Sequence, residues 1–288
     1  MVSKHFLQAA VVLLSPLLCS AQDDIKLMYM FKNPETSNNE ALKTLGFNAL
    51  SFFGINLESN GDIMWALSDL DGSPDVTLAS NGQYVGGDTY ANLIKSYKAD
   101  GSKINRLEVT LGNYANIKSK IAQGSGPDTT LYKNLAALKQ AWNLDAITND
   151  DESEYDLSST VAFGKMLGDI GYKYTLAPYT NIDYWSQVVS QVSSETLDRA
   201  YLQCYDGGAG NVPSQWVDAL KIPVIPLLWV TNDAKPYDGS TPMQCQSKFQ
   251  DWKNNDRVSG GGYWNNYDIE KLNSSYAAYA DVLNQVFG

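Results

Sequence analysis

The sequence predicts a single-domain α/β fold, a (β/α)₈ barrel. Eight short apolar or alternating runs recur along the chain, and stretches with helical periodicity separate most of them. Strands that alternate with helices in this way form a parallel sheet. Without an N-terminal segment of 21 residues, described below, the chain divides into eight units of about 33 residues, which matches the size of a closed eight-fold barrel.

The eight expected strands are Ile25–Phe31, Asn48–Phe53, Ile104–Thr110, Leu144–Asn149, Tyr172–Ala177, Arg199–Cys204, Val224–Trp229 and Gly262–Trp264. The expected helices are Tyr90–Tyr97, Leu131–Trp142, Leu157–Leu167, Tyr184–Val192, Gln215–Leu220, Gln244–Trp252 and Ile269–Phe287. The alternative fold is an open doubly wound sheet. That fold requires a Gly-rich phosphate-binding turn after the first strand, and the segment Phe31–Pro34 has no glycine.

The segment Leu57–Gly87 is rich in Ser, Gly and Asp, yet it contains the apolar run Ile63–Leu67. We therefore expect an ordered excursion after the second strand, such as a hairpin, rather than a linker between domains. Barrel active sites lie on the loops that follow the strands, so an excursion at this place is positioned to form a wall of the cleft.

The N-terminus has the pattern of a secretory signal peptide over residues 1–21. Lys4 precedes an apolar run from Ala9 to Leu18, and Cys19-Ser20-Ala21 offers small residues for cleavage. The apolar run is shorter than the roughly 20 residues that a membrane-spanning helix needs. We therefore expect an extracellular protein whose barrel domain covers residues 22–288.

Cleavage would remove Cys19 and His5, the only histidine. The two remaining cysteines, Cys204 and Cys245, are expected to form a disulfide if the compartment is oxidising. A chain without histidine cannot form a Ser-His-Asp triad, a cysteine–histidine pair or a zinc cluster, and we expect no metal and no cofactor. The net charge of −11 argues against nucleic acid or an anionic membrane as partner. We expect a monomer.

The segment Asn143–Glu152 contains the residues that point to chemistry, because an apolar strand ends there in three successive acids. Alternation along a strand predicts that Asp150 and Glu152 point into the barrel mouth, with Asp145 further down, whereas Asp151 points away. Two carboxylates on one face repel each other and raise one pKa, which gives the neutral acid that glycoside hydrolysis needs. A solvated acidic loop and a calcium site are the alternatives.

These residues resemble glycoside hydrolase family 18, which includes chitinases and endo-β-N-acetylglucosaminidases. The family carries D-x-x-D-x-D-x-E on its fourth barrel strand, and Asp145, Asp150 and Glu152 match it, whereas Thr148 replaces the middle acid. The ending Asp-Asp-Glu is more similar to some of the endoglycosidases. The run Gln203–Asp206 is similar to the family's [M/Q]-x-Y-D on the sixth strand, and Trp264 stands at the end of the eighth. Thr110–Asn113 replaces the usual S-x-G-G.

The resemblance implies a substrate-assisted retaining mechanism. Glu152 would protonate the glycosidic oxygen, Asp150 would hold the substrate's acetamide N–H, and Tyr205 would donate to its carbonyl. A threonine at position 148 cannot take a charge, so an altered pH profile is expected. The expected substrate contacts are Asp145, Tyr179, Gln203, Asp206, Trp229 and Trp264.

The function that this resemblance implies is a secreted hydrolase of β-1,4 linkages in glycans that contain N-acetylglucosamine. Chitin oligosaccharides and the core of N-glycans both remain open as substrates. Two further hypotheses use the same scaffold without catalysis. One is a chitin-binding lectin-like protein, and the other is a secreted inhibitor or storage protein.

Overall fold

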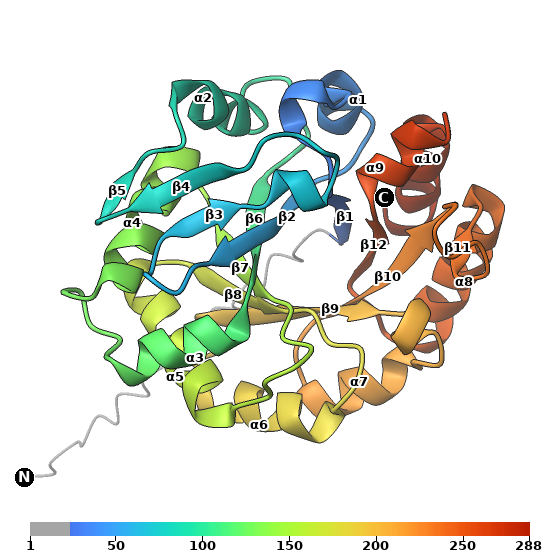
Figure 1. The fold of residues 1–288 in the computed structure, drawn as a ribbon. Coiled ribbons are helices and arrows are strands. Elements are labelled where there is room, and N and C mark those ends of the chain that lie inside the picture. The colour runs from blue at the N-terminus through green and yellow to red at the C-terminus, as the bar shows by residue number, and fades with distance from the viewer. Residues whose placement is uncertain (1–23) are drawn as a thin grey trace, which may run out of the picture.

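The computed structural model describes residues 24–288, and the predicted signal peptide lies outside these residues. The chain forms a closed barrel of eight parallel strands (Figure 1). These strands are β1 (Ile25–Met30), β2 (Ala49–Leu57), β6 (Arg106–Gly112), β7 (Ala146–Asn149), β8 (Lys173–Leu176), β9 (Leu197–Gln203), β10 (Val224–Val230) and β12 (Gly260–Trp264). The first strand pairs with both β2 and β12, which closes the barrel. The predicted (β/α)₈ fold is confirmed.

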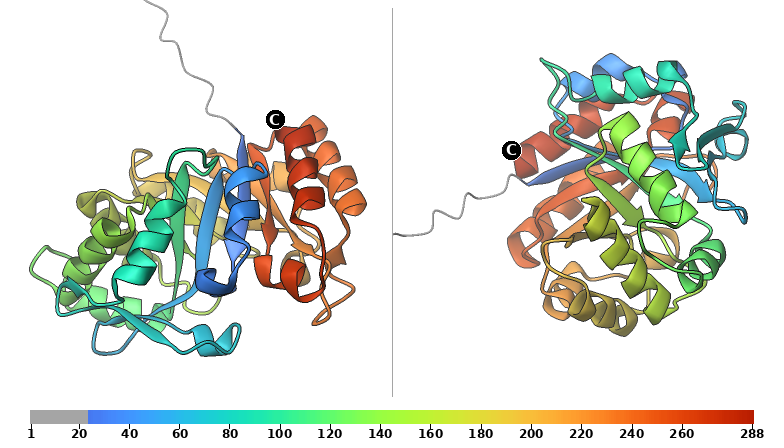
Figure 2. Two further views of the ribbon diagram at one scale, coloured as in Figure 1. Left: turned by 90° about the horizontal axis from the view of Figure 1, so that it is seen from above. Right: turned by 90° about the vertical axis from the view of Figure 1, so that its left-hand side faces the viewer.

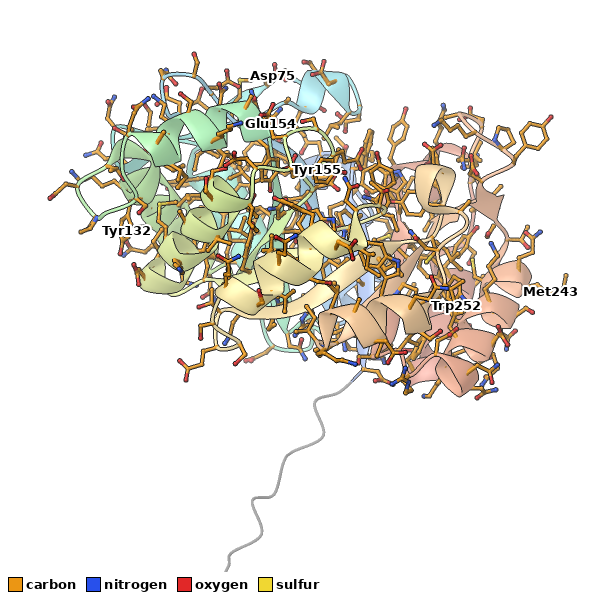
Figure 3. All side chains as sticks on the ribbon, turned by 90° about the horizontal axis from the view of Figure 1, so that it is seen from below. Asp75, Tyr132, Glu154, Tyr155, Met243 and Trp252 are labelled. Atoms are coloured by element: carbon orange, nitrogen blue, oxygen red, sulfur yellow. The ribbon has the colours of Figure 1, made fainter. Side chains whose placement is uncertain are left out.

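Helices surround the barrel on its outside (Figure 2). They are α1 (Asn39–Thr44), α2 (Asp88–Ser96), α3 (Tyr114–Ala122), α4 (Thr130–Trp142), α5 (Leu157–Ile170), α6 (Ile182–Gln191), α7 (Pro213–Leu220), α8 (Pro242–Asn255), α9 (Asn266–Lys271) and α10 (Tyr276–Phe287). Side chains project outward from this ring, and Met243 stands at the outer edge of α8 (Figure 3). None of the helices in the described part of the chain is long and apolar enough to cross a membrane.

Sequence periodicity missed α1 and α3 and joined two helices at the C-terminus. The expected helix Ile269–Phe287 is divided into α9 and α10 because Asn273 adopts a left-handed conformation with a φ of 51°. Ser275 then caps α10 by accepting a hydrogen bond from the backbone N–H of Ala278. The short α1 begins in the same way, at the cap Asn38.

The main hydrophobic core lies between the strands and the helices, and Phe52 is at one of its aromatic centres. The ring of Phe52 contacts those of Trp65, Tyr97 and Trp142 at centroid distances of 6.0, 5.9 and 5.8 Å. A smaller cluster fills the inside of the barrel and includes Tyr29 and Tyr201. The barrel interior also buries charged and hydroxyl side chains, so it is only partly apolar.

The segment after the second strand is an antiparallel extension of the sheet, as the sequence predicted. It contains β3 (Ile63–Trp65), the 3₁₀ turn η2 (Leu67–Asp69), β4 (Val76–Ser80) and β5 (Gln83–Tyr84). Asn134 of α4 fixes it, because its side chain accepts from Gly82 N–H and donates to Gly61 carbonyl oxygen, both at 2.7 Å. We call this segment the β3–β5 excursion.

A bulge in β2 connects the excursion to the barrel. The register with β6 shifts between Phe52 and Ile55, at Gly54, whose φ is 77°. The extra residue breaks the alternation of side chains along the strand. As a result, Ile55 belongs to the outer core although Phe53, two residues earlier, packs against the cluster inside the barrel.

The expected disulfide is not formed. Cys204 and Cys245 are both free and buried. The Cys245 thiol donates to the carbonyl oxygen of Ser240 at 3.7 Å, and burial raises its pKa to about 12. Burial raises the pKa of the Cys204 thiol as well. Because the thiolate is the reactive form, both cysteines behave as apolar core residues that resist oxidation.

The burial of both cysteines without a bridge predicts two free thiols among residues 24–288. In denaturant without reductant, a thiol reagent should titrate both cysteines, and the native protein should react slowly because both side chains are buried. In a Cys245→Ser variant the reagent should titrate one thiol, that of Cys204. If thiols appear only after a reductant is added, the two cysteines are bridged and this description of the core is wrong.

Candidate active site

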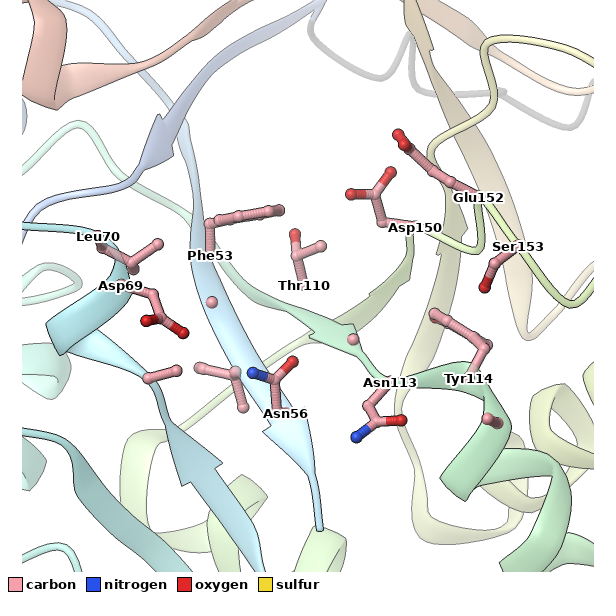
Figure 4. A pocket seen from close by; sticks show the side chains of 15 residues that line it. Phe53, Asn56, Asp69, Leu70, Thr110, Asn113, Tyr114, Asp150, Glu152 and Ser153 are labelled. Atoms are coloured by element: carbon pink, nitrogen blue, oxygen red, sulfur yellow. The ribbon is translucent and has the colours of Figure 1, made fainter.

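Two acids project into the cavity at the carboxyl end of β7. Figure 4 shows the carboxyl groups of Asp150 and Glu152 on the same side of the chain, across the cavity from the ring of Phe53 in β2. Asp151 turns the other way and is 2% exposed. Its carboxylate accepts the backbone N–H groups of Ser153, Glu154 and Tyr155 at 3.1, 2.8 and 2.9 Å. Asp151 thus fixes the loop that presents the other two acids.

A single amide group holds the two acids together. The side-chain nitrogen of Gln203, at the end of β9, donates to Asp150 at 3.0 Å and to Glu152 at 3.1 Å. The same nitrogen lies 3.0 Å from the carbonyl oxygen of Ala177, which follows β8. Neighbouring parallel strands end at the same edge of a barrel. The Gln203 amide therefore joins the ends of β7, β8 and β9 at the mouth.

The pair has one carboxyl group that keeps its proton near neutral pH. The pKa of Asp150 is raised to about 8. Burial is the largest cause, and the nearby carboxylates of Glu152 and Asp151 contribute to the same increase. The sequence predicted that repulsion would raise one pKa of the pair, and this carboxyl is Asp150. In the free protein Asp150 is therefore mostly neutral at pH 7.

The acids lie where two hollows of the surface meet. One has a volume of about 400 Å³ and is bounded by β2, the loop after β6 and the β3–β5 excursion, which contributes Asp69 and Leu70 (Figure 4). The other has a volume of about 290 Å³ and lies over β9, β10 and β12. Both are lined by Phe53, Asp150 and Glu152. The excursion walls the cleft, as expected.

Aromatic rings form one side of the smaller hollow. Trp264 stands edge-on to Phe53 at a centroid distance of 4.6 Å and parallel to Tyr205 at 6.5 Å. Trp229 lies 5.8 Å from Tyr205 and donates its indole N–H to Asp268 at 2.7 Å. Three of the four predicted aromatic residues, Tyr205, Trp229 and Trp264, therefore converge beside the acids, where they offer flat apolar surfaces of the kind that pack against ligand rings.

Asp206 lies in the cleft, as predicted, and Tyr179 does not. Asp206 lines the smaller hollow and forms an ion pair with Lys235 of the loop after β10. The ring of Tyr179 packs against Gly207, and its backbone carbonyl accepts from the Asn211 side chain at 2.9 Å. The prediction for Tyr179 is corrected because the ring is used in packing between two loops and lines neither hollow.

Asp145 is also placed differently from the prediction. It precedes β7, at the opposite end from the cleft, where its carboxylate accepts the backbone N–H of Leu107 at 2.7 Å and pairs with Lys98. The spacing explains the error, since residues 145 and 150 differ by an odd number and face opposite sides of the sheet. Asp145 thus stabilises the strand start and cannot contact a ligand in the cleft.

Sequence analysis missed a polar group below the acids. Glu108 of β6 is fully buried and accepts the Thr148 hydroxyl at 2.8 Å, together with hydrogen bonds from Tyr201 and Arg106. The sequence signal was an acid between two apolar residues, Leu107 and Val109, inside an expected strand. The calcium-site alternative gains no support, since no three His, Cys, Asp or Glu residues among residues 24–288 gather in a suitable cluster.

The raised pKa of Asp150 predicts that Asp150→Asn stabilises the protein in a pH-dependent way. Below about pH 4, Asp150 is protonated in both the folded and the unfolded chain, so the stability gap between variant and wild type is smallest. Between about pH 4 and pH 8 the unfolded carboxyl ionises and the folded one does not. The wild type then loses stability relative to the variant, by at most about 1.4 kcal/mol per pH unit.

Thermal unfolding of the two proteins from pH 3 to pH 9 measures this gap, which should grow up to about pH 8 and then level off. Asp100→Asn, at an exposed turn, is the matched control and should show no such trend. A gap that does not widen above pH 4 would contradict the assignment of the raised pKa to Asp150.

Comparison with known proteins shows similarity in structure only. No family model matches the chain, and no curated protein matches its sequence. A GH18 chitinase from Pseudoalteromonas aurantia superposes with a TM-score of 0.65 at 15% identity, covering 91% of this chain and 99% of that one. The catalytic domain of a hyperthermophilic chitinase from Pyrococcus furiosus gives a TM-score of 0.62 at 13% identity, with coverages of 93% and 97%.

A class V chitinase from Nicotiana tobaccum, solved in complex with NAG4, superposes with a TM-score of 0.59 at 10% identity and coverages of 92% and 99%. The similarity extends over nearly the whole barrel in each case. It confirms the fold that the resemblance to glycoside hydrolase family 18 implied. This chain has the fold of the GH18 chitinases.

Proposed function

We propose that this protein is a glycosidase that cleaves the β-1,4 linkage after an N-acetylglucosamine unit. The observation that carries the proposal is the pair Asp150 and Glu152, held by one amide nitrogen where two hollows meet beside Trp264. The solved structures with this fold support a carbohydrate partner, since two of them were obtained with NAG4 and with chito-oligosaccharides.

The pair shares one catalytic proton. In the free protein this proton rests on Asp150, whose pKa is raised to about 8 by burial and by the like charges of Glu152 and Asp151. When the acetamide N–H of a bound sugar reaches Asp150, the ionised form becomes the better partner because it accepts the hydrogen bond. The proton then passes to Glu152, which lies exposed in the cleft and becomes the acid.

Bond breaking uses the substrate's own acetamide. Its carbonyl oxygen attacks the anomeric carbon as the glycosidic bond breaks, and Glu152 gives its proton to the departing oxygen. The oxazolinium ion that forms is stabilised by the Asp150 carboxylate. Water then adds to the anomeric carbon, and its proton returns to Glu152. The configuration at the anomeric carbon is retained, and no bond between sugar and protein forms.

Tyr205 and Trp264 position the reacting sugar. Burial raises the pKa of the Tyr205 hydroxyl, and the Asp150 and Glu152 carboxylates add to this, so the hydroxyl keeps its proton for donation to the acetamide carbonyl. Trp264 is half-buried in the smaller hollow and offers its ring to the apolar face of the sugar. The predicted signal peptide assigns this activity to the outside of the cell.

Replacement of the acid should abolish turnover. The wild type should release products from chitotetraose or from a high-mannose glycoprotein, and Glu152→Gln should be slower by roughly 10²–10⁴-fold, as expected for loss of a general acid. Asp145→Asn is the matched control because it changes a carboxyl of the same segment that lies outside the cleft. It should retain activity.

The same experiment separates the alternatives. If the wild type and Glu152→Gln both bind chitotetraose and neither cleaves it, the hypothesis of a lectin-like protein is favoured over that of an enzyme. Neither binding nor turnover of either substrate would favour the inhibitor or storage protein. Which substrate is cleaved decides between chitin oligosaccharides and N-glycans.

A thiazoline that mimics the oxazolinium ion should inhibit competitively. Its ring takes the place of the positively charged intermediate beside Asp150, so inhibition should weaken in Asp150→Asn by tenfold or more, about 1.4 kcal/mol. Inhibition constants for the two proteins measure this effect. Equal inhibition of both would show that Asp150 does not contact the acetamide-derived ring.

A further inference from the structure

A cluster of four charged side chains lies inside the barrel, below the catalytic pair. Arg106 and Glu108 come from β6, and Asp198 and Arg199 come from β9. Arg106 donates to both oxygens of Asp198 at 2.8 and 3.0 Å and to Glu108. Arg199 donates to Asp198 at 3.2 Å. Two cations thus balance two anions at the end of the barrel opposite the cleft.

Glu108 is the member of this cluster that reaches toward the cleft. One of its oxygens accepts the hydroxyl proton of Tyr201, and the other accepts that of Thr148 at 2.8 Å. Burial opposes ionisation, but the charges of Arg106 and Arg199 outweigh it and lower the pKa of Glu108. Glu108 is therefore an anion within the barrel core.

This anion fixes the direction of two hydroxyl groups. A hydroxyl has one proton to donate, and Thr148 and Tyr201 both give theirs to Glu108. Toward the barrel mouth they can offer only lone pairs. Thr148 is two residues before Asp150, on the same face of β7. Its oxygen can therefore accept a hydrogen bond from a group on the side of the mouth, such as a protonated Asp150, but cannot donate one.

Tyr29 occupies the space between these groups. Its ring packs edge-on against Tyr201 at a centroid distance of 6.3 Å, and its buried hydroxyl has no hydrogen-bond partner. Burial raises the pKa of Tyr29, and Asp150 and Glu108 both add to this, which places the hydroxyl within the electrostatic reach of both carboxyl groups. A buried hydroxyl without a partner costs free energy, so its place between the two acids calls for a functional reason.

The other polar groups that face Asp150 are Asp151 and Glu152 on its own loop, Gln203 and Tyr205 from the end of β9, and Tyr114 from α3. The Tyr114 hydroxyl is buried without a side-chain partner. Of the groups around Asp150 in the described part of the chain, only Gln203 donates a side-chain hydrogen bond to its carboxyl.

We propose that Glu108 is a positioning residue, which acts through the Thr148 and Tyr201 hydroxyls to keep Asp150 protonated until a substrate amide arrives. Its effect on catalysis rests on the proposed function; its effect on Asp150 does not. In family 18 an acid stands where this chain has Thr148, and here the neighbouring strand supplies a carboxylate to that threonine. If Glu108 loses its charge, the two hydroxyls can turn their protons toward Asp150 and stabilise its ionised form.

The first test needs no substrate. The stability gap between wild type and Asp150→Asn levels off at the pH where folded Asp150 ionises, at about pH 8. The same gap measured in a Glu108→Gln background should level off about one pH unit lower, a tenfold change in the ionisation equilibrium. Asp198→Asn is the matched control, since Asp198 shares Arg106 but contacts neither hydroxyl. It should leave the levelling-off point in place.

The second test uses turnover of chitotetraose. In Glu108→Gln the limb of the kcat/KM profile that reports Asp150 of the free protein should move to lower pH by about one unit, with KM at the pH optimum changed by less than about twofold. Adding Thr148→Asp to Glu108→Gln returns a carboxylate to the neighbourhood of Asp150 and should move the limb back. If Glu108 served only to balance the charges of Arg106 and Arg199, adding Thr148→Asp would not move the limb back.

A lower melting temperature of Glu108→Gln, with both the levelling-off point and the kcat/KM profile unchanged, would overturn the proposal and leave Glu108 a structural residue. If Glu108→Gln does not fold, Glu108→Asp serves instead. It keeps the charge for the arginines but is one methylene shorter, so it should weaken the Thr148 contact and shift both readouts in the same direction. If the levelling-off point shifts in Glu108→Gln but the wild type turns over no substrate, the proposed function alone would be refuted.

Discussion

The side-chain amide of Gln203 donates to Asp150 and to Glu152, and the rest of the site depends on this contact. It connects the ends of β7 and β9 across β8, so the two carboxyl groups stay close although like charges repel. Burial then leaves one proton on the pair, on Asp150, at neutral pH. A closed barrel is what makes the contact possible, because it brings the ends of strands that are distant in sequence to one rim.

The barrel interior is arranged for this pair as much as for stability. Most barrels fill this space with branched apolar side chains. Here the lower layers hold Arg106, Glu108 and Arg199, and the Nε and Nη1 atoms of Arg199 have no partner. Burying such groups costs free energy unless they are paired. The proposed role of Glu108 gives a functional reason to keep these groups in spite of the cost, because fixed charges and hydroxyls can set the protonation of a carboxyl above them.

The structural similarity to chitinases at 10–15% identity shows that this barrel fold tolerates wide change in sequence. In this chain the side chains that meet at the barrel mouth come from strand ends, at Asp150, Glu152, Gln203, Tyr205 and Trp264. The rest of the barrel can change as long as the strands keep their order and length. The β3–β5 excursion illustrates this freedom, since it adds a wall to the larger hollow through Asp69 and Leu70 without disturbing the barrel.

The sequence by itself determined the number and order of the barrel strands, because apolar runs and helical stretches alternate along it. It also determined that Asp150 and Glu152, directly after β7, share a face, because residues two apart do so where the extended chain has no bulge. Tertiary structure decided what depends on distant segments. The pairing of Asp145 with Lys98, the packing of Tyr179 on Gly207, the burial of Cys204 and Cys245 as free thiols and the contact of Glu108 with Thr148 all join units whose relative placement no local pattern specifies.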